Sequence, residues 1–222
     1  MSAVGSGHPR GAGRVRMTPD GRREQLLDLG VRLLSTRSVD ELSIDMLAEE
    51  AGISRGLLYH YFGNKRDFHR AVVRKAADDL IRVTAPPAEG EPLERLATSL
   101  EAYVDYVMAN YEGYASLVRG AGSGNADLLE IYEEARAALT DRIFETRTDG
   151  VADGRPLLDV LGVADTPATR LMVRGWAAMT EDVVLTWVRD PGGVDKRDLL
   201  AMLAAALPGV LPGVLPGALP DA

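Results

Sequence analysis

The 222-residue chain contains no cysteine and only three histidines. The lack of cysteine excludes both a disulfide framework and a metal site built from thiolates. The histidines are His8, His60 and His69, and this spacing does not suit a shared metal ion. We expect an intracellular protein that needs neither a metal nor a cofactor.

Long apolar runs and common catalytic motifs are also missing. No stretch approaches the roughly 20 apolar residues of a membrane helix. The N-terminal residues are partly basic but have no apolar core that would make them a secretion signal. The sequence has no Gly-rich phosphate loop and no nucleophile elbow. It therefore predicts a cytoplasmic protein that is not an enzyme and has no membrane partner.

The most informative segment begins with an amphipathic helix after Ser43. Its apolar side chains have one-sided helical spacing, at Ile44, Leu47, Ala48 and Ala51. Ser43 can cap the first amides of this helix, and Gly52 can end it in a left-handed conformation. The pattern predicts a short helix followed by a sharp turn.

A second short helix follows this turn. Ser54 is placed to cap it, and Leu58 and Phe62 recur at i and i+4, so they can pack back on the first helix. The other sides of the helix carry a polar and aromatic set, Arg55, Gly56, Tyr59, His60 and Tyr61. Two helices joined by a short glycine-containing turn form a helix-turn-helix, whose second helix enters the major groove of DNA.

Helices are expected on both sides of this pair. Asn64 and Asp67 resemble a capping box, so a third helix begins with Lys65 in its first turn, where a cation favours an external anion such as a phosphate. Residues 20–37 have leucines on one face and predict a helix that packs on the pair. The result is a three-helix head.

This segment resembles the N-terminal signature of the TetR family of transcriptional regulators, strongly from about Arg22 to Val73. Leu33 and Leu34 stand where the family often has an aromatic residue, and Tyr61 stands where it often has histidine. The matching residues are Ala48, Glu49, Ala51, Gly52, Ile53, Ser54, Arg55, Gly56, Leu58, Tyr59, Tyr61, Phe62, Asn64 and Lys65. The resemblance implies a homodimer joined through its last two long helices and a body that binds a small ligand. It also implies a repressor that the ligand releases from a palindromic operator.

Several residues of the head are expected to contact DNA. The reach of Arg55 suits guanine O6 and N7 or a phosphate, and Gly56 allows close approach to the duplex. The family likeness favours Tyr59 as a phosphate contact, and either Tyr59 or Tyr61 can instead pack inside the head. The predicted DNA-binding residues are Ser43, Ser54, Arg55, Gly56, Tyr59, His60, Tyr61 and Lys65.

The charge distribution supports a DNA partner although the whole chain has a net charge of −8. Residues 1–75 hold 13 Lys and Arg against 9 Asp and Glu, which gives +4. Residues 76–222 hold 12 against 24, which gives −12. Local cations neutralise phosphates, so a basic head can bind DNA while the acidic body favours one docking orientation.

The remaining sequence predicts an all-α fold of about nine helices in four parts. We expect a flexible arm over 1–18, a DNA-binding domain over 19–66, a helical ligand-binding and dimerisation domain over 67–207, and a low-complexity tail over 208–222. The arm carries arginines that could reach DNA or simply be solvated. The helices expected after the head are 65–83, 91–109, 111–120, 124–147, 166–189 and 195–207.

Two groups of residues are candidates for the ligand site. Tyr103, Tyr106, Tyr111 and Tyr114 cluster near the join of two body helices, and their rings combine apolar area with a polar tip. The segment 168–188 is apolar around much of its circumference and includes Trp176 and Met179, which suit the core, a dimer seam or a ligand cavity. For the tyrosines, spacing alone favours ordinary helix packing with the hydroxyls at the surface over a ligand site.

Three functions are compatible with the sequence. The interpretation we favour is a DNA-binding regulator, and an activator or a regulator without a ligand is an alternative. A helix-turn-helix protein that acts only through protein contacts would show no salt-dependent DNA affinity. An enzyme in a helical body lacks any supporting motif.

Overall fold

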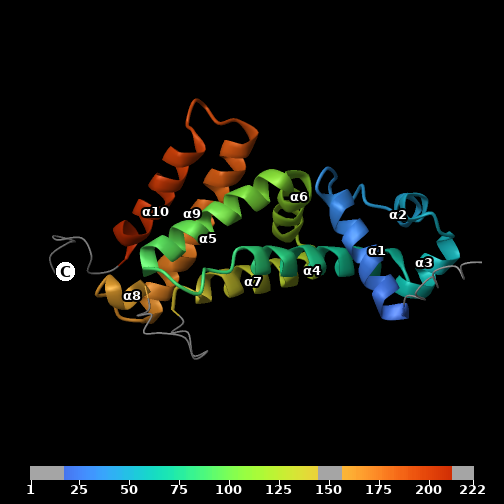
Figure 1. Cartoon of the computed structure of the whole chain (residues 1–222), viewed down its shortest axis with the longest axis horizontal. Helices are drawn as coiled ribbons and strands as arrows, with labels where there is room; N and C mark the ends of the chain where they lie inside the picture. Colours follow the sequence, from blue (N-terminus) through green and yellow to red (C-terminus); the bar gives the residue numbers. More distant parts are fainter. Residues whose placement is uncertain (1–17, 145–156, 212–222) are drawn as a thin grey trace, which may run out of the picture.

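The computed structural model describes residues 18–144 and 157–211. The predicted arm up to residue 17 and most of the tail lie outside these residues. Within them the chain is all-helical (Figure 1). The helices are α1 (Pro19–Leu34), α2 (Ile44–Ala51), α3 (Arg55–Phe62), α4 (Lys65–Val83), α5 (Pro92–Ala109), α6 (Tyr111–Gly122), α7 (Ala126–Asp141), α8 (Leu157–Val160), α9 (Pro167–Arg189) and α10 (Lys196–Val210). None of these helices is both long and apolar enough to span a membrane.

The described residues form ten helices, one more than the sequence predicts, because the short α8 has too little periodicity to be seen. The expected helix 124–147 is longer than the observed α7. Helix α7 ends at Asp141, where amides 143 and 144 bond carbonyls three residues back. The expected helix 195–207 ends too early, because α10 continues to Val210. Pro208 fits inside the last turn of α10, which ends two residues later.

The head is built on one apolar core. Helices α1, α2 and α3 pack on one another and on α4, and Leu47, Leu58, Phe68 and Val72 are fully buried between them. The same core continues into α6 and α7, which contribute Leu117, Leu128 and Ile131. The head is therefore anchored to the body by shared packing.

The second core lies in the body among α5, α9 and α10. It includes Val104, Val107, Val173, Trp176 and Leu199. Figure 1 shows α4 running from the head into the body with α7 beside it, and these two helices are in extensive contact. Helix α4 thus begins directly behind the helix-turn-helix and ends within the body.

Candidate DNA-binding surface and ligand cavity

The turn between α2 and α3 has the geometry expected from its sequence. Ser43 Oγ accepts a hydrogen bond from the Met46 amide at 3.1 Å and caps α2. Gly52 ends α2 with φ 63°, a left-handed conformation that favours glycine. The Ile53 amide then donates to the Ala48 carbonyl at 3.0 Å, and Ser54 Oγ caps α3 through the Leu57 amide. These bonds fix α3 at a defined angle to α2.

The eight predicted DNA-binding residues lie on the described head at different depths. Ser54, Arg55, Gly56, Tyr59, His60 and Lys65 are exposed. Ser43 is half-buried, since its hydroxyl caps α2. Tyr61 is half-buried against the head core, so of the two tyrosines it is the one that packs inside. The exposed face also carries Leu57, an apolar side chain suited to a thymine methyl group, which the sequence analysis did not single out.

Arg55 forms an ion pair with Asp45, a contact that was not predicted from the sequence. Its Nε lies 2.6 Å from Asp45 Oδ1 on the first turn of α2. Both side chains remain largely exposed. The pair joins the two helices of the helix-turn-helix at their N-terminal ends.

The N-terminus of α4 presents Lys65 beside α3. Asn64 Oδ1 accepts a hydrogen bond from the Asp67 amide at 3.0 Å, and the Asn64 side-chain amide donates to Asp67 Oδ2 at 2.7 Å. This is the expected cap, closed through the side chain of Asn64 instead of its backbone. Lys65 has no ion pair among the described residues, so its ammonium group is available to a phosphate.

The next cations along α4 face the body instead. Arg66 bonds Asp127, Arg70 Nη2 lies 2.9 Å from Glu130 Oε2, and Arg74 bonds Glu134, all on α7. The hydrogen bond from Arg66 is the main cause that lowers the pKa of the Asp127 carboxyl. Three of the 13 basic residues counted for the head are therefore engaged by the acidic body.

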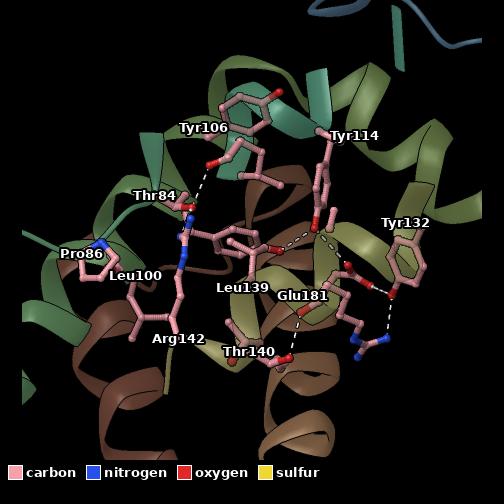
Figure 2. Close-up of a pocket in the computed structure, with 18 of the residues that line it drawn as sticks. Thr84, Pro86, Leu100, Tyr106, Tyr114, Tyr132, Leu139, Thr140, Arg142 and Glu181 are labelled. Atoms are coloured by element: carbon pink, nitrogen blue, oxygen red, sulfur yellow. Dashed lines mark hydrogen bonds between the residues drawn. The ribbon is translucent and has the colours of Figure 1, made fainter. Parts of the chain in front are cut away.

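A cavity of about 190 Å³ lies in the body, lined by residues of α1, α4, α5, α6, α7, α8 and α9. This volume is far above the roughly 10–15 Å³ that one water molecule needs. Most of its walls are apolar, and Figure 2 shows Leu100 and Leu139 among them. The apolar lining also includes Leu80, Pro86, Leu96, Ile143, Leu157 and Trp176.

One wall of the cavity carries a connected polar cluster (Figure 2). The Tyr103 and Tyr114 hydroxyls lie 2.9 Å apart, and Tyr114 donates to Glu181 Oε2 at 3.0 Å. Tyr132 donates to Glu181 Oε1 at 2.8 Å and accepts from Arg136 Nη1 at 2.8 Å. Burial raises the pKa of the Tyr103, Tyr114 and Tyr132 hydroxyls, so all three stay protonated and can donate.

Two further guanidinium groups lie at the end of the cavity near the C-terminus of α4. Arg142 donates to Thr84 Oγ1 at 3.1 Å, and Arg95 donates from Nε to the Pro87 carbonyl at 2.9 Å. Arg142 also donates to the Ile81 carbonyl in the last turn of α4, where the helix carbonyls favour a cation. The cavity therefore has a cationic end and a separate wall with a satisfied carboxylate.

The structure brings most, but not all, of the predicted ligand-site residues together. Tyr103, Tyr106, Tyr114 and Trp176 line the cavity, whereas Tyr111 and Met179 do not. Tyr111 is the first residue of α6 and lies outside the cavity. The cavity-lining residues of α9 are 176, 177, 180 and 181, one stripe of the helix, and Met179 falls on its outer side with 39% of its surface exposed.

Several polar cavity residues were not predicted from the sequence, among them Ser99, Thr180, Glu181 and Arg136. A signal was available for Glu181, a carboxylate on a helix whose other faces are mostly apolar. Ser99, Thr180 and Arg136 are common residue types at ordinary helical positions. Only the packing of α5, α7 and α9 places them around one cavity.

Comparisons with known proteins agree with this geometry. Residues 26–72 match the family model described as bacterial regulatory proteins, tetR family. The chain is 24% identical over 198 residues to the HTH-type transcriptional activator FasR of Mycolicibacterium smegmatis, covering 86% of this chain and 84% of FasR. The fold is also similar to that of Bacillus subtilis FadR in complex with stearoyl-CoA, with a TM-score of 0.60 and 18% identity over 86% of this chain and 98% of that one.

A crystal structure of a tetR-family transcriptional regulator from Streptomyces coelicolor gives the clearest assignment. It has 31% sequence identity and a TM-score of 0.72, and the match covers 87% of this chain and 82% of that chain. The shared sequence extends through the body as well as the helix-turn-helix. The chain therefore belongs to the TetR family and is a DNA-binding transcriptional regulator, not an enzyme.

Proposed function

We propose that the protein is a homodimeric repressor that binds a near-palindromic operator and is released from it by a small apolar ligand. The observation that carries this proposal is the course of α4. Its first residue, Lys65, lies beside the exposed face of α3, and its later residues Val73, Ala77, Leu80 and Thr84 line the cavity. A molecule that changes the packing around α4 can therefore alter the position of the head.

Contacts with DNA centre on α3. Arg55 and Tyr59 are exposed on it, and Gly56 has no atom within 4 Å of where a Cβ would lie, so the duplex can approach closely. Ser43, Ser54 and Lys65 mark the N-termini of three helices, where amides and the ammonium group suit phosphates. His60 completes the contact set that we propose, whereas Tyr61, which the sequence also suggested, packs against the head core.

An exposed apolar face on the last two long helices supports a homodimer. Leu171 is 68% exposed, and Met172 and Met179 are also exposed on α9. Met202 on α10 is 54% exposed. Large apolar side chains gathered on neighbouring helices typically mark a contact between subunits, and a symmetric dimer would place two α3 helices on one palindrome.

The chemistry of the cavity supports a ligand with an apolar body. The cavity lining is mostly apolar, so it favours an apolar molecule over water. The position of the cavity next to α4 suits an effector site. The relative FadR was crystallised with stearoyl-CoA, so long-chain acyl thioesters are the first compounds to test. The regulator would act in the cytoplasm, where both the operator and such metabolites occur.

Selection of bound fragments from the source genome, at near-physiological salt, tests this proposal. We expect the full-length protein to enrich a palindromic site and the Tyr59→Ala plus Lys65→Ala variant to lose it. A reporter gene placed behind the site then determines the sign of regulation, since the relative FasR is named an activator. The absence of any enriched site with ligand-stripped protein would favour a scaffold that acts through protein contacts.

The dimer has its own test. Leu171→Glu introduces a charge into the exposed apolar face of α9 and is expected to shift the protein to a monomer in sedimentation. Leu129→Glu on α7 serves as the control, because Leu129 is also an exposed apolar residue but lies on a different helix. A dimer that survives Leu171→Glu together with Met202→Glu would exclude this face.

A further inference from the structure

Two hydroxyl groups of the cavity lining have no hydrogen-bond partner among the described residues. They are Ser99 Oγ on α5 and Thr180 Oγ1 on α9, and both oxygens are buried. Thr180 as a whole is only 4% exposed. A buried hydroxyl without a partner is unfavourable, because it has lost its bonds to water and gained none in return.

Other hydroxyls on the helices of this region behave differently. Thr84, Thr98 and Thr140 each donate to the carbonyl four residues earlier, at 2.7, 3.0 and 2.9 Å. This is the usual bond for serine and threonine inside a helix. Ser99 and Thr180 make no such bond, so their hydroxyls remain available to a molecule in the cavity.

The polar groups near them are already satisfied. Glu181, which follows Thr180, accepts one hydrogen bond on each carboxylate oxygen, from Tyr114 and Tyr132. Arg136 donates to Tyr132 and contacts the face of its ring. Among the described lining residues, the Ser99 and Thr180 hydroxyls are therefore donors that a ligand group in the cavity can engage.

We infer that the cavity takes an apolar molecule with an uncharged carbonyl group in its buried part, of the acyl ester or thioester class, and that Ser99 and Thr180 bind this carbonyl. The inference rests on the proposed function only in taking the cavity as the ligand site. A carbonyl oxygen accepts two hydrogen bonds, which suits two hydroxyl donors. A free carboxylate is disfavoured at Thr180, because the Glu181 carboxylate is the next residue of α9 and also lines the cavity.

Two CoA derivatives that differ only at the carbonyl test the inference. Palmitoyl-CoA is a thioester, whereas S-hexadecyl-CoA is the corresponding thioether and lacks the carbonyl oxygen. We expect the full-length protein to bind the thioester about tenfold more tightly by calorimetry, as the loss of one or two hydrogen bonds would give. Palmitate, the free acid, is expected to bind more weakly than the thioester.

Variants then assign the preference to the two hydroxyls. Thr180→Val and Ser99→Ala should each reduce the preference for the thioester, and Thr180→Ser should keep it. Thr98→Val is the matched control, because Thr98 lies on α5 beside Ser99 but bonds its own helix. Circular dichroism and operator binding establish that each variant is folded.

Three results would overturn the inference. They are equal binding of thioester and thioether, a preference that survives in the Thr180→Val plus Ser99→Ala double variant, and the failure of palmitoyl-CoA and octanoyl-CoA to bind at all. None of these results affects the enrichment of an operator by the ligand-free protein. The proposed function and the carbonyl site can therefore fail separately.

Discussion

Asp45 Oδ1 on α2 lies 2.6 Å from Arg55 Nε on α3, so an acidic side chain holds the arginine that we propose as a DNA contact. The two side chains are 56% and 70% exposed, and an exposed pair of this kind contributes only about 0–1 kcal/mol to stability. Its main consequence concerns orientation. With Nε engaged, both terminal NH2 groups of Arg55 remain free for a bidentate contact with guanine.

Removal of Asp45 is therefore expected to reduce sequence preference more than affinity. Asp45→Ala should weaken operator binding several-fold, because Arg55 loses its fixed orientation. The same variant should bind unrelated DNA more tightly, because a negative charge near the phosphates has gone. Titration of both duplexes by fluorescence anisotropy measures the ratio.

Glu50→Ala is the matched control for this prediction. It removes an exposed carboxylate from the same helix without touching Arg55. It should raise both affinities in parallel and leave their ratio unchanged. If Asp45→Ala also raises both in parallel, the Asp45 carboxylate acts only as a general negative charge.

Lys65 and Arg66 are neighbours in sequence with different expected roles. Lys65 is exposed beside α3, whereas Arg66 is bonded to Asp127 on α7. Lys65→Gln should reduce the slope of log K against log salt by about 1 per protomer, as expected for the loss of one phosphate contact. Arg66→Gln should leave the slope nearly unchanged. Equal reductions in the two variants would show that Arg66 leaves Asp127 to contact the duplex.

The ion pairs of α4 explain why the charge of the head could not be interpreted from sequence alone. The excess of +4 in residues 1–75 includes Arg66, Arg70 and Arg74, which point toward carboxylates of α7. Their partners lie about 60 residues away in the chain. Helical spacing indicates which residues share a face, but it does not indicate what that face meets.

The local structure of the head was predictable because its signals are short-range. The caps Ser43, Ser54 and Asn64 and the left-handed Gly52 all act within four residues of their position. The end of α7 and the short α8 depend on weaker local signals and were not predicted. The cavity forms only when several helices pack together. The tyrosines could be proposed because they cluster in the sequence, whereas Ser99 and Thr180 lie on separate helices and could not.

Close approach of the head and the body depends on Gly113. A Cβ on this residue would lie 2.6 Å from the carbonyl oxygen of Leu34, so α6 would have to move away from α1. Gly113→Ala is expected to lower the free energy of unfolding by about 1–3 kcal/mol in urea denaturation. Gly122→Ala, in the last turn of the same helix, meets no atom within 4 Å and should be neutral or slightly stabilising. Equal effects of the two substitutions would contradict the close contact.

His69 gives the stability of the head a dependence on pH. Its Nε2 lies 2.6 Å from the Leu42 carbonyl oxygen, so this nitrogen donates a hydrogen bond. Burial lowers the pKa of the His69 imidazole; Lys65 adds to this effect, and the Leu42 carbonyl and Asp40 oppose it. As pH falls below about 6.5, the unfolded chain takes up a proton that the folded head does not. The free energy of unfolding should therefore be highest above this pH and decrease as pH falls through the lowered pKa.

The substitution His69→Gln isolates this contribution, because glutamine cannot titrate but can still donate to the Leu42 carbonyl. Urea unfolding at pH 5, 6 and 7 should show a flatter pH dependence for His69→Gln than for the wild type. His60→Gln, on the exposed face of α3, should keep the wild-type dependence. A wild-type dependence in His69→Gln would mean that other groups cause the loss of stability between pH 7 and 5. Asp127, which is paired with Arg66 of α4, would not explain it, because its lowered pKa confines its own loss of stability to more acidic pH.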